Sequence, residues 1–237
     1  MATATRRAAT VLAMALSLAF SSGCAQSHLE SASQSLEKED YESAITFLEL
    51  GAQKGDRRCA YLLGAMLISG EGIDADLAEG ERWIREAAEA ELPIAQAYLG
   101  ILYANGEGVE KDLTAAAEWY RSAAEYGNPL GQTAYGVATF HGMGVPADPV
   151  EGYSWTKLAA DQDYPRAIAN LSEMSDEMTK KEREQAEKRA ARFRPKENEG
   201  GAPDFPRNRE YRSFTNVRGL APSFRAAAKH SVPPAQR

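Results

Sequence analysis

The chain has 237 residues and a formal net charge of −7, with 26% charged and 43% hydrophobic residues. Because a nucleic-acid backbone is itself anionic, this acidic balance disfavours DNA or RNA as a partner. The chain has only two cysteines, and no two of its three histidines stand at a metal-ligand spacing. We therefore expect neither a disulfide-stabilised domain nor a metal site.

Residues 1–24 have the pattern of an export signal. Two arginines precede an apolar run over 8–20, which is too short to span a bilayer as a mature helix. Small residues then lead to Cys24, and this order resembles a bacterial lipoprotein signal in which the cysteine is lipidated. The resemblance implies a lipid anchor on the periplasmic side of the envelope, at the outer membrane. The alternatives are cleavage after Ala25, giving a soluble periplasmic or secreted protein, and an uncleaved anchor.

A 36-residue period runs through the middle of the chain. Such a period indicates a stacked array in which each copy is one supersecondary unit. We divide the array into a first copy at 57–92, a second at 93–128 and a third at 129–164. The residues that recur at this interval are Gly64, Gly100 and Gly136; Gly70-x-Gly72, Gly106-x-Gly108 and Gly142-x-Gly144; Asp76, Asp112 and Asp148; Trp83, Trp119 and Trp155; and Pro93, Pro129 and Pro165.

Each copy is expected to form two helices, A and B. In the second copy the apolar spacing predicts helix A over 94–104 and helix B over 113–126, with Gly106 ending the first and Asp112 capping the second. A glycine inside a helix costs about 1 kcal/mol relative to alanine, so the recurrence of Gly100 and its equivalents predicts the close approach of another backbone. The tryptophan of helix B is expected to fill the space between successive hairpins.

Weaker versions of the pattern flank the three copies. Segment 25–56 is interpreted as an N-terminal capping or partial repeat, with helices near 27–38 and 40–54, and 165–194 as C-terminal capping helices that keep the array soluble. The remaining segment, 195–237, is basic, rich in proline and without helical periodicity, so we expect it to be disordered. A solvated tail is the default, and attraction to anionic envelope components is the alternative.

The second copy also contains the most specific local pattern of the chain. Its elements are YLGILYANGEGV at 98–109, Lys111-Asp112, AEWY at 117–120, Ala123-Ala124 and Gly127-Asn128-Pro129. This pattern resembles a Sel1-like repeat, a relative of the tetratricopeptide repeat. The resemblance implies an all-α, right-handed α-solenoid of antiparallel helix pairs whose concave face is lined mainly by A helices. It also implies binding of proteins or peptides.

Candidate binding residues lie on helix A outside the repeat signature, at spacings of four and three. If their row faces the concave surface, it is an apolar strip suited to a peptide, with two glutamines beside it that could bond a ligand backbone. If it faces the neighbouring helix B it is core, which is the commoner role of an apolar stripe. The row consists of Tyr61, Ala65 and Ile68; Ala97, Ile101 and Ala104; and Thr133, Val137 and Phe140, beside Gln96 and Gln132.

The sequence offers little sign of catalysis. His141 stands at a turn position shared with Ser69 and Asn105, Cys59 takes the place of Ala95 in a tight helix contact, and no phosphate-binding or dinucleotide motif is present, so no cofactor is expected. We therefore predict a non-catalytic scaffold or adaptor of the bacterial envelope that binds an unidentified protein or peptide. The alternative is a cell-wall hydrolase, or a regulator that binds a small cell-wall fragment.

Overall fold

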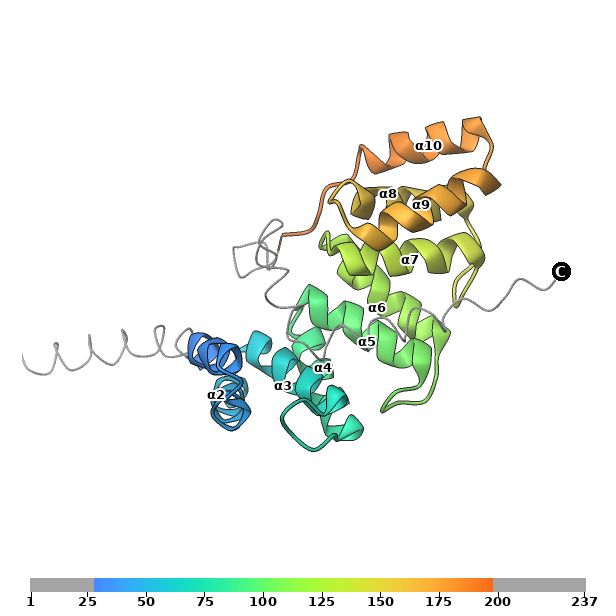
Figure 1. Ribbon diagram of the computed structural model, residues 1–237. Coiled ribbons are helices and arrows are strands. Elements are labelled where there is room, and N and C mark those ends of the chain that lie inside the picture. Colours follow the sequence, from blue (N-terminus) through green and yellow to red (C-terminus); the bar gives the residue numbers. More distant parts are fainter. Residues whose placement is uncertain (1–27, 198–237) are drawn as a thin grey trace, which may run out of the picture. The chain divides into compact units, whose positions relative to one another are not determined.

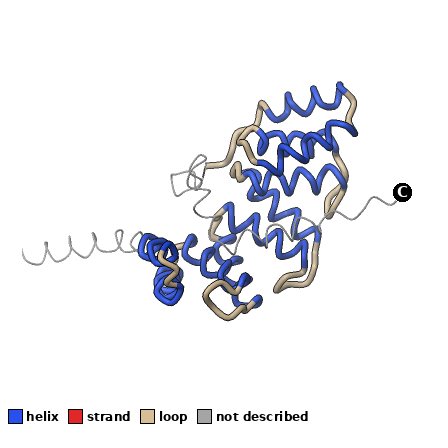
Figure 2. Tube along the Cα trace, viewed as in Figure 1, coloured by secondary structure: helices blue, strands red, loops and turns tan. Residues whose placement is uncertain are grey.

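The computed structural model describes residues 28–197, so the expected signal, Cys24 and most of the expected tail lie outside the described residues. Within 28–197 the chain is helical, with short connections and no strand (Figure 2). It divides into two compact units, one ending at Leu63 and the other beginning at Gly64. The fold is an all-α helical repeat solenoid, as the period predicted.

The first unit contains the two leading helices that the sequence predicted. Residues 28–37 are helical, and α2 spans Tyr41–Gln53 with Asp40 as its N-cap, where the carboxylate accepts a hydrogen bond from the Ser43 N–H. Helix α3, Arg57–Ser69, begins in this unit and continues into the second.

The second unit is a stack of helices that follow one another in chain order, coloured from green through yellow to orange in Figure 1. The most extensive contacts join α5 to α6, α6 to α7 and α7 to α8, so α5, α6, α7 and α8 each pack on the helix before and the helix after, whereas α10 packs on α8. The helices are α4 Leu77–Glu89, α5 Pro93–Asn105, α6 Leu113–Glu125, α7 Pro129–His141, α8 Pro149–Ala160, α9 Pro165–Glu177 and α10 Lys180–Ala190.

The helix ends follow from local sequence chemistry. The carboxylates of Asp76, Asp112 and Asp148 accept hydrogen bonds from backbone N–H groups in the first turns of α4, α6 and α8. Gly106 and Gly142 follow α5 and α7 in the left-handed conformation that a helix C-terminus favours, at φ 77° and 72°. Both predictions about caps are confirmed.

The glycine inside each A helix allows two backbones to touch. A Cβ atom at Gly64 would lie 2.7 Å from the Gly80 carbonyl oxygen, one at Gly100 would lie 3.0 Å from that of Ala116, and one at Gly136 would lie 2.8 Å from that of Gly152. The partners are themselves 36 residues apart, so one contact recurs in each hairpin. The predicted close approach is confirmed.

The second glycine of the turn joins neighbouring hairpins in the second and third copies. A Cβ atom at Gly108 would lie 2.5 Å from the carbonyl oxygen of Leu77, the first residue of helix α4 in the preceding copy. Gly144 lies against the carbonyl of Leu113 in the same way. Local sequence chemistry explains only the first glycine of the pair, because the partner of the second belongs to another copy.

The tryptophans that we expected to fill the space between hairpins are not fully buried. Trp83, Trp119 and Trp155 are all half-buried, and the residue that follows each of them is buried instead. Those following residues, Ile84, Tyr120 and Thr156, face the helix-A glycines. Helical spacing alone does not say which of two adjacent residues faces helix A of the same hairpin, and here it is the residue that follows the tryptophan.

The array ends differently from its interior. Ser172 of α9 stands where the other A helices have glycine, and it is exposed. Helix α10 packs on α8 and, through Ala186, closes a buried cluster with Tyr153 and Met174. A capping box between Thr179 and Glu182 starts α10.

Replacing Gly136 by alanine is expected to destabilise the protein by about 1–3 kcal/mol, because the new methyl group meets the Gly152 backbone in a filled space. In an exposed helix the same change would stabilise by about 1 kcal/mol. Urea unfolding followed by circular dichroism measures the difference. Ser172→Ala, at the equivalent exposed position, is the control and should leave the midpoint nearly unchanged. A Gly136→Ala protein as stable as wild type would contradict the contact.

Candidate protein-binding surfaces

The row predicted on the A helices lies in the interior rather than on an open face. Only Ala104 and Val137 of this row are half-buried. The other members are buried: Tyr61, Ala65, Ile68, Ala97, Ile101, Thr133 and Phe140. The structure therefore favours the packing role that the sequence left as one of two alternatives.

The end of the row shows why it is buried. Phe140 belongs to a cluster with Tyr153, Met174 and Met178, and Val137 packs against that cluster. Of the two alternatives for Val137 and Phe140, the structure therefore supports the core, because residues of α8, α9 and α10 enclose their side of helix α7. Thr133 is also engaged, since its hydroxyl donates to the Pro129 carbonyl oxygen at 2.7 Å.

The two glutamines beside the row bond the protein's own backbone. The side-chain amide of Gln96 donates to the Ala88 carbonyl oxygen at 3.2 Å, and that of Gln132 donates to the equivalent carbonyl of Ala124 at 3.4 Å. Each glutamine thus adds a second donor to a carbonyl at the end of the preceding B helix, which also accepts the backbone N–H of Glu91 or Gly127. The Gln132 carbonyl oxygen also accepts from the Gln162 amide at 2.8 Å. These contacts support a structural role instead of the ligand contact that the sequence suggested.

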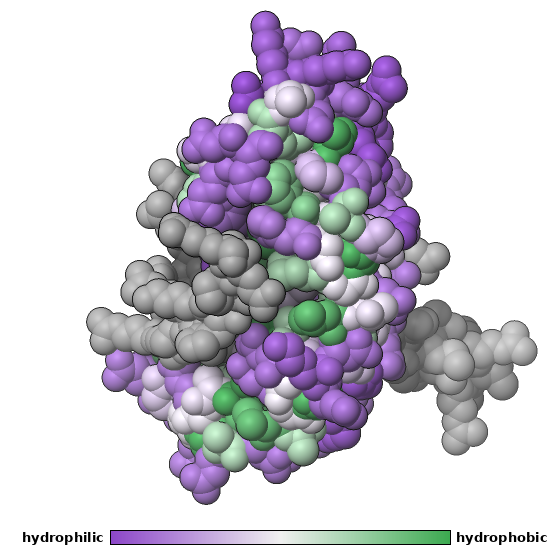
Figure 3. All heavy atoms as spheres, turned by 90° about the vertical axis from the view of Figure 1, so that its right-hand side faces the viewer, coloured by the Kyte–Doolittle hydropathy of each residue, from purple (hydrophilic) through white to green (hydrophobic). Residues whose placement is uncertain are grey.

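Exposed apolar side chains occur instead at the edge where the A–B turns lie. Leu77 and Leu113, each the first residue of a B helix, are 45% and 40% exposed. The connections of α5 to α6 and of α7 to α8 lie on the right-hand side of Figure 1, which faces the viewer in Figure 3. On this side, apolar patches are separated by polar ones. Val109 and Val145 are half-buried in the same turns. The 36-residue period already placed Leu77 and Leu113 in one register, but only the structure shows that both are exposed.

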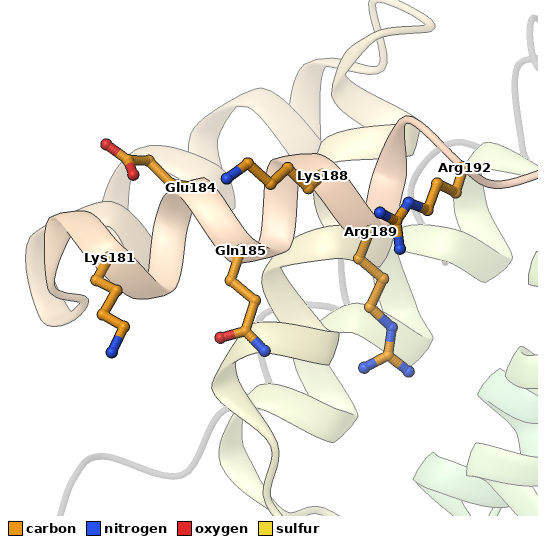
Figure 4. Close-up of a pocket in the computed structure, with 6 residues that line it drawn as sticks. All are labelled: Lys181, Glu184, Gln185, Lys188, Arg189 and Arg192. Atoms are coloured by element: carbon orange, nitrogen blue, oxygen red, sulfur yellow. The ribbon is translucent and has the colours of Figure 1, made fainter.

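A second candidate surface is the outer face of α10. A hollow of about 630 Å³ runs along it, and the side chains of one helical stripe project beside it (Figure 4). Arg189 pairs with Glu151 at 3.1 Å, whereas no described residue forms an ion pair with Lys181, Lys188 or Arg192. The face is electropositive, but its charges are solvated, as expected for a closing helix. The lining residues are Lys181, Glu184, Gln185, Lys188, Arg189 and Arg192.

The titratable groups of the interior are poorly placed for chemistry. Burial, with a smaller contribution from Asp56, raises the pKa of the Cys59 thiol to about 12, so it is almost never a thiolate near neutral pH. Burial likewise raises the pKa of Tyr120. Between residues 28 and 197, no three His, Cys, Asp or Glu side chains group as metal ligands would, and no helix there is long and apolar enough to cross a bilayer.

Comparisons with known proteins agree on the fold. A family model described as Sel1 repeat matches residues 25–56, 57–92, 93–128 and 129–164. Among solved structures, the chain is similar to c5321, a protective antigen of uropathogenic Escherichia coli strains displaying an SLR fold. That match has 25% identity and a TM-score of 0.59, and it covers 83% of this chain and 37% of that one.

A Sel1 repeat protein from Oxalobacter formigenes is also similar, with 28% identity and a TM-score of 0.56. This match covers 59% of this chain and 58% of that one. The chain therefore spans less than two thirds of either relative's length. The comparison with curated proteins finds no match.

Truncating Phe140 to alanine should destabilise the protein by about 3–5 kcal/mol, because it removes a ring from the cluster under α9 and α10. If the residue instead lined an open strip, the change would cost little. Chemical unfolding measures the loss. Ile168→Ala, at a side chain that is 51% exposed, serves as the control and should stay within about 0.5 kcal/mol of wild type. If both substitutions reduced the free energy of unfolding by an equally small amount, the assignment of Phe140 to the core would be contradicted.

Proposed function

We propose that this chain, which belongs to the Sel1 repeat family, is a non-catalytic adaptor that binds a protein or peptide on the periplasmic side of a bacterial envelope. Sel1 repeat solenoids generally mediate contacts between proteins. Stacked hairpins suit this role because equivalent residues of successive copies form a continuous surface.

The observation that carries the proposal is the exposure of Leu77 and Leu113 in the same register of neighbouring copies. Backbone contacts at Gly108 and Gly144 fix the turns beside them, so the two leucines are presented by a rigid edge. Apolar side chains held in this way contribute binding energy without a large ordering cost. The buried A-helix row has no comparable access to a partner.

A hydrolase, or a regulator that binds a small cell-wall fragment, would use a deep pocket with convergent polar groups. The described residues that line the hollow are solvated side chains of α10 and of the turn that follows it. No feature between residues 28 and 197 favours these alternatives over protein binding.

The envelope location is supported by the sequence of the N-terminal segment. Its apolar run ends in small residues and Cys24, and these lie outside the described residues. A lipid attached at Cys24 would hold the repeat array close to a membrane surface. A partner found there would then meet the array at a high effective concentration.

Placing glutamates at both edge leucines, in Leu77→Glu/Leu113→Glu, should leave the fold intact and weaken partner binding at least about tenfold. Crosslinking capture from native envelopes, quantified by mass spectrometry, compares the variant with wild type. Ile168→Glu adds a charge at another exposed apolar position and is the control, with circular dichroism used to confirm folding. Undiminished capture by the folded double variant would show that this edge is not the binding site.

The location is tested separately through Cys24. We expect wild type to incorporate labelled fatty acid and to fractionate with membranes, and Cys24→Ser to lose both properties. The repeat array should fold equally well in the two forms, because Cys24 lies before the first described helix. A Cys24→Ser protein that stays in the membrane fraction would refute lipidation as the anchor.

A further inference from the structure

After α10 the chain turns back along the array. The ring of Phe193 packs edge-on against Trp155 of α8, with ring centroids 5.2 Å apart. Three residues later, the backbone N–H of Lys196 donates to the Glu125 carbonyl oxygen at 2.9 Å. Residues 191–197 therefore pass from the third copy to the second, against the direction of the repeats. This corrects the expectation of disorder for residues 195–197.

The contacts of this returning segment are specific. The Lys196 ammonium lies 2.5 Å from a carboxylate oxygen of Glu125 and 5.9 Å from the centre of the Tyr126 ring. Burial alone would raise the pKa of Glu125, but its hydrogen bonds to Lys196 and Arg121 outweigh that effect and lower it. Pro195 fits against Gly127. An aromatic ring on a tryptophan and a cation on a glutamate thus hold the segment.

The same pair of contact positions recurs one copy earlier. Trp119 is the equivalent of Trp155, and Glu89 is the equivalent of Glu125, each 36 residues before it. Trp119 is half-exposed, and among the described residues no ring stacks on it. The second copy therefore presents an aromatic platform like the one that Phe193 covers.

The acidic position is available as well. Glu86 and Glu89 are exposed, and no described residue forms an ion pair with either. The arginine that would match Arg121 is Arg85, which pairs with Glu81 and donates to the Tyr103 hydroxyl instead. The end of α4 is thus a concentration of negative charge without a described counter-ion.

The chain itself carries a segment with the matching chemistry. Phe193-Arg194-Pro195-Lys196 is followed twelve residues later by Phe205-Pro206-Arg207-Asn208-Arg209, which again combines phenylalanine, proline and basic residues. Twelve extended residues span up to about 40 Å. One copy is two helix layers of about 10 Å each, so the next pair of contact positions lies within reach.

We propose that residues 205–209 of this chain dock one copy further along the array, with Phe205 on Trp119 and with Arg207 and Arg209 at Glu86 and Glu89. The tail then acts as a strap over the outer face of the B helices. It neutralises acidic groups there, and a partner that uses this face must displace it. This inference concerns the B-helix face and is independent of the partner proposed for the turn edge.

Limited trypsin digestion of the purified full chain tests the proposal at the bonds after Arg207 and Arg209. A synthetic peptide of residues 198–237 supplies the intrinsic cleavage rate of each bond. We expect cleavage in the full chain to be at least about fivefold slower than in the peptide, while the bond after Arg225 is cut at similar rates in both. Equal rates after Arg207 and Arg209 in chain and peptide would overturn the proposal.

Variants on both sides of the contact identify its chemistry. In Glu86→Gln/Glu89→Gln, the rates of cleavage after Arg207 and Arg209 should rise to within about twofold of those in the peptide. The control, Glu173→Gln/Glu177→Gln, removes the same charge from exposed positions on α9 and should leave cleavage slow. Phe205→Ser should also abolish protection, and Phe224→Ser should leave it unchanged. Both of these lie in the tail, so loss of the array fold cannot explain the result. If a variant and its control changed the cleavage rates equally, in either pair, the proposed contact would be overturned.

The occupant is tested by dilution. Docking within one chain is independent of protein concentration, so protection should persist over a hundredfold dilution. Protection that is lost on dilution would assign the B-helix face to the tail of a second copy and overturn the intramolecular strap.

Discussion

The backbone contact between helices A and B of each hairpin is the constraint on which the second unit depends. Gly64, Gly100 and Gly136 leave no side chain between the two helices, so the carbonyl oxygens of Gly80, Ala116 and Gly152 lie where a Cβ atom would otherwise be. Close-packed interiors do not adjust to such a volume easily. The contact therefore fixes the distance between the helices, and its repetition gives these three hairpins the same contact geometry.

This spacing determines which surfaces remain for binding. With helices so close, the A-helix side chains on either side of the glycine are enclosed, as Ala97 and Ile101 show. The glutamines of the same helices are engaged by carbonyls of the preceding B helix. Exposed groups are then found at the turn edge, on the outer face of the B helices and at the closing helix. Functional contacts are expected where packing has left side chains available.

The sequence predicted those parts of the fold that a local or periodic pattern determines. The period located the hairpins, and Asp112 and Gly106 marked helix ends, because caps depend on residues a few positions apart. The binding surface could not be derived in the same way. Whether Trp119 or the adjacent Tyr120 faces inward depends on how two helices rotate against each other, and the period is identical in both cases. The contact of Gly108 with Leu77 joins different copies and leaves no local signature.

Residues 191–197 run back along the array because equivalent groups recur from one copy to the next. Each copy presents the outer face of its B helix at the same spacing, so a segment that binds one copy meets a similar set of groups at the next. Phe193 on Trp155 and Lys196 on Glu125 bridge two copies in this way. Such a bridge stabilises a contact that a single hairpin does not contain.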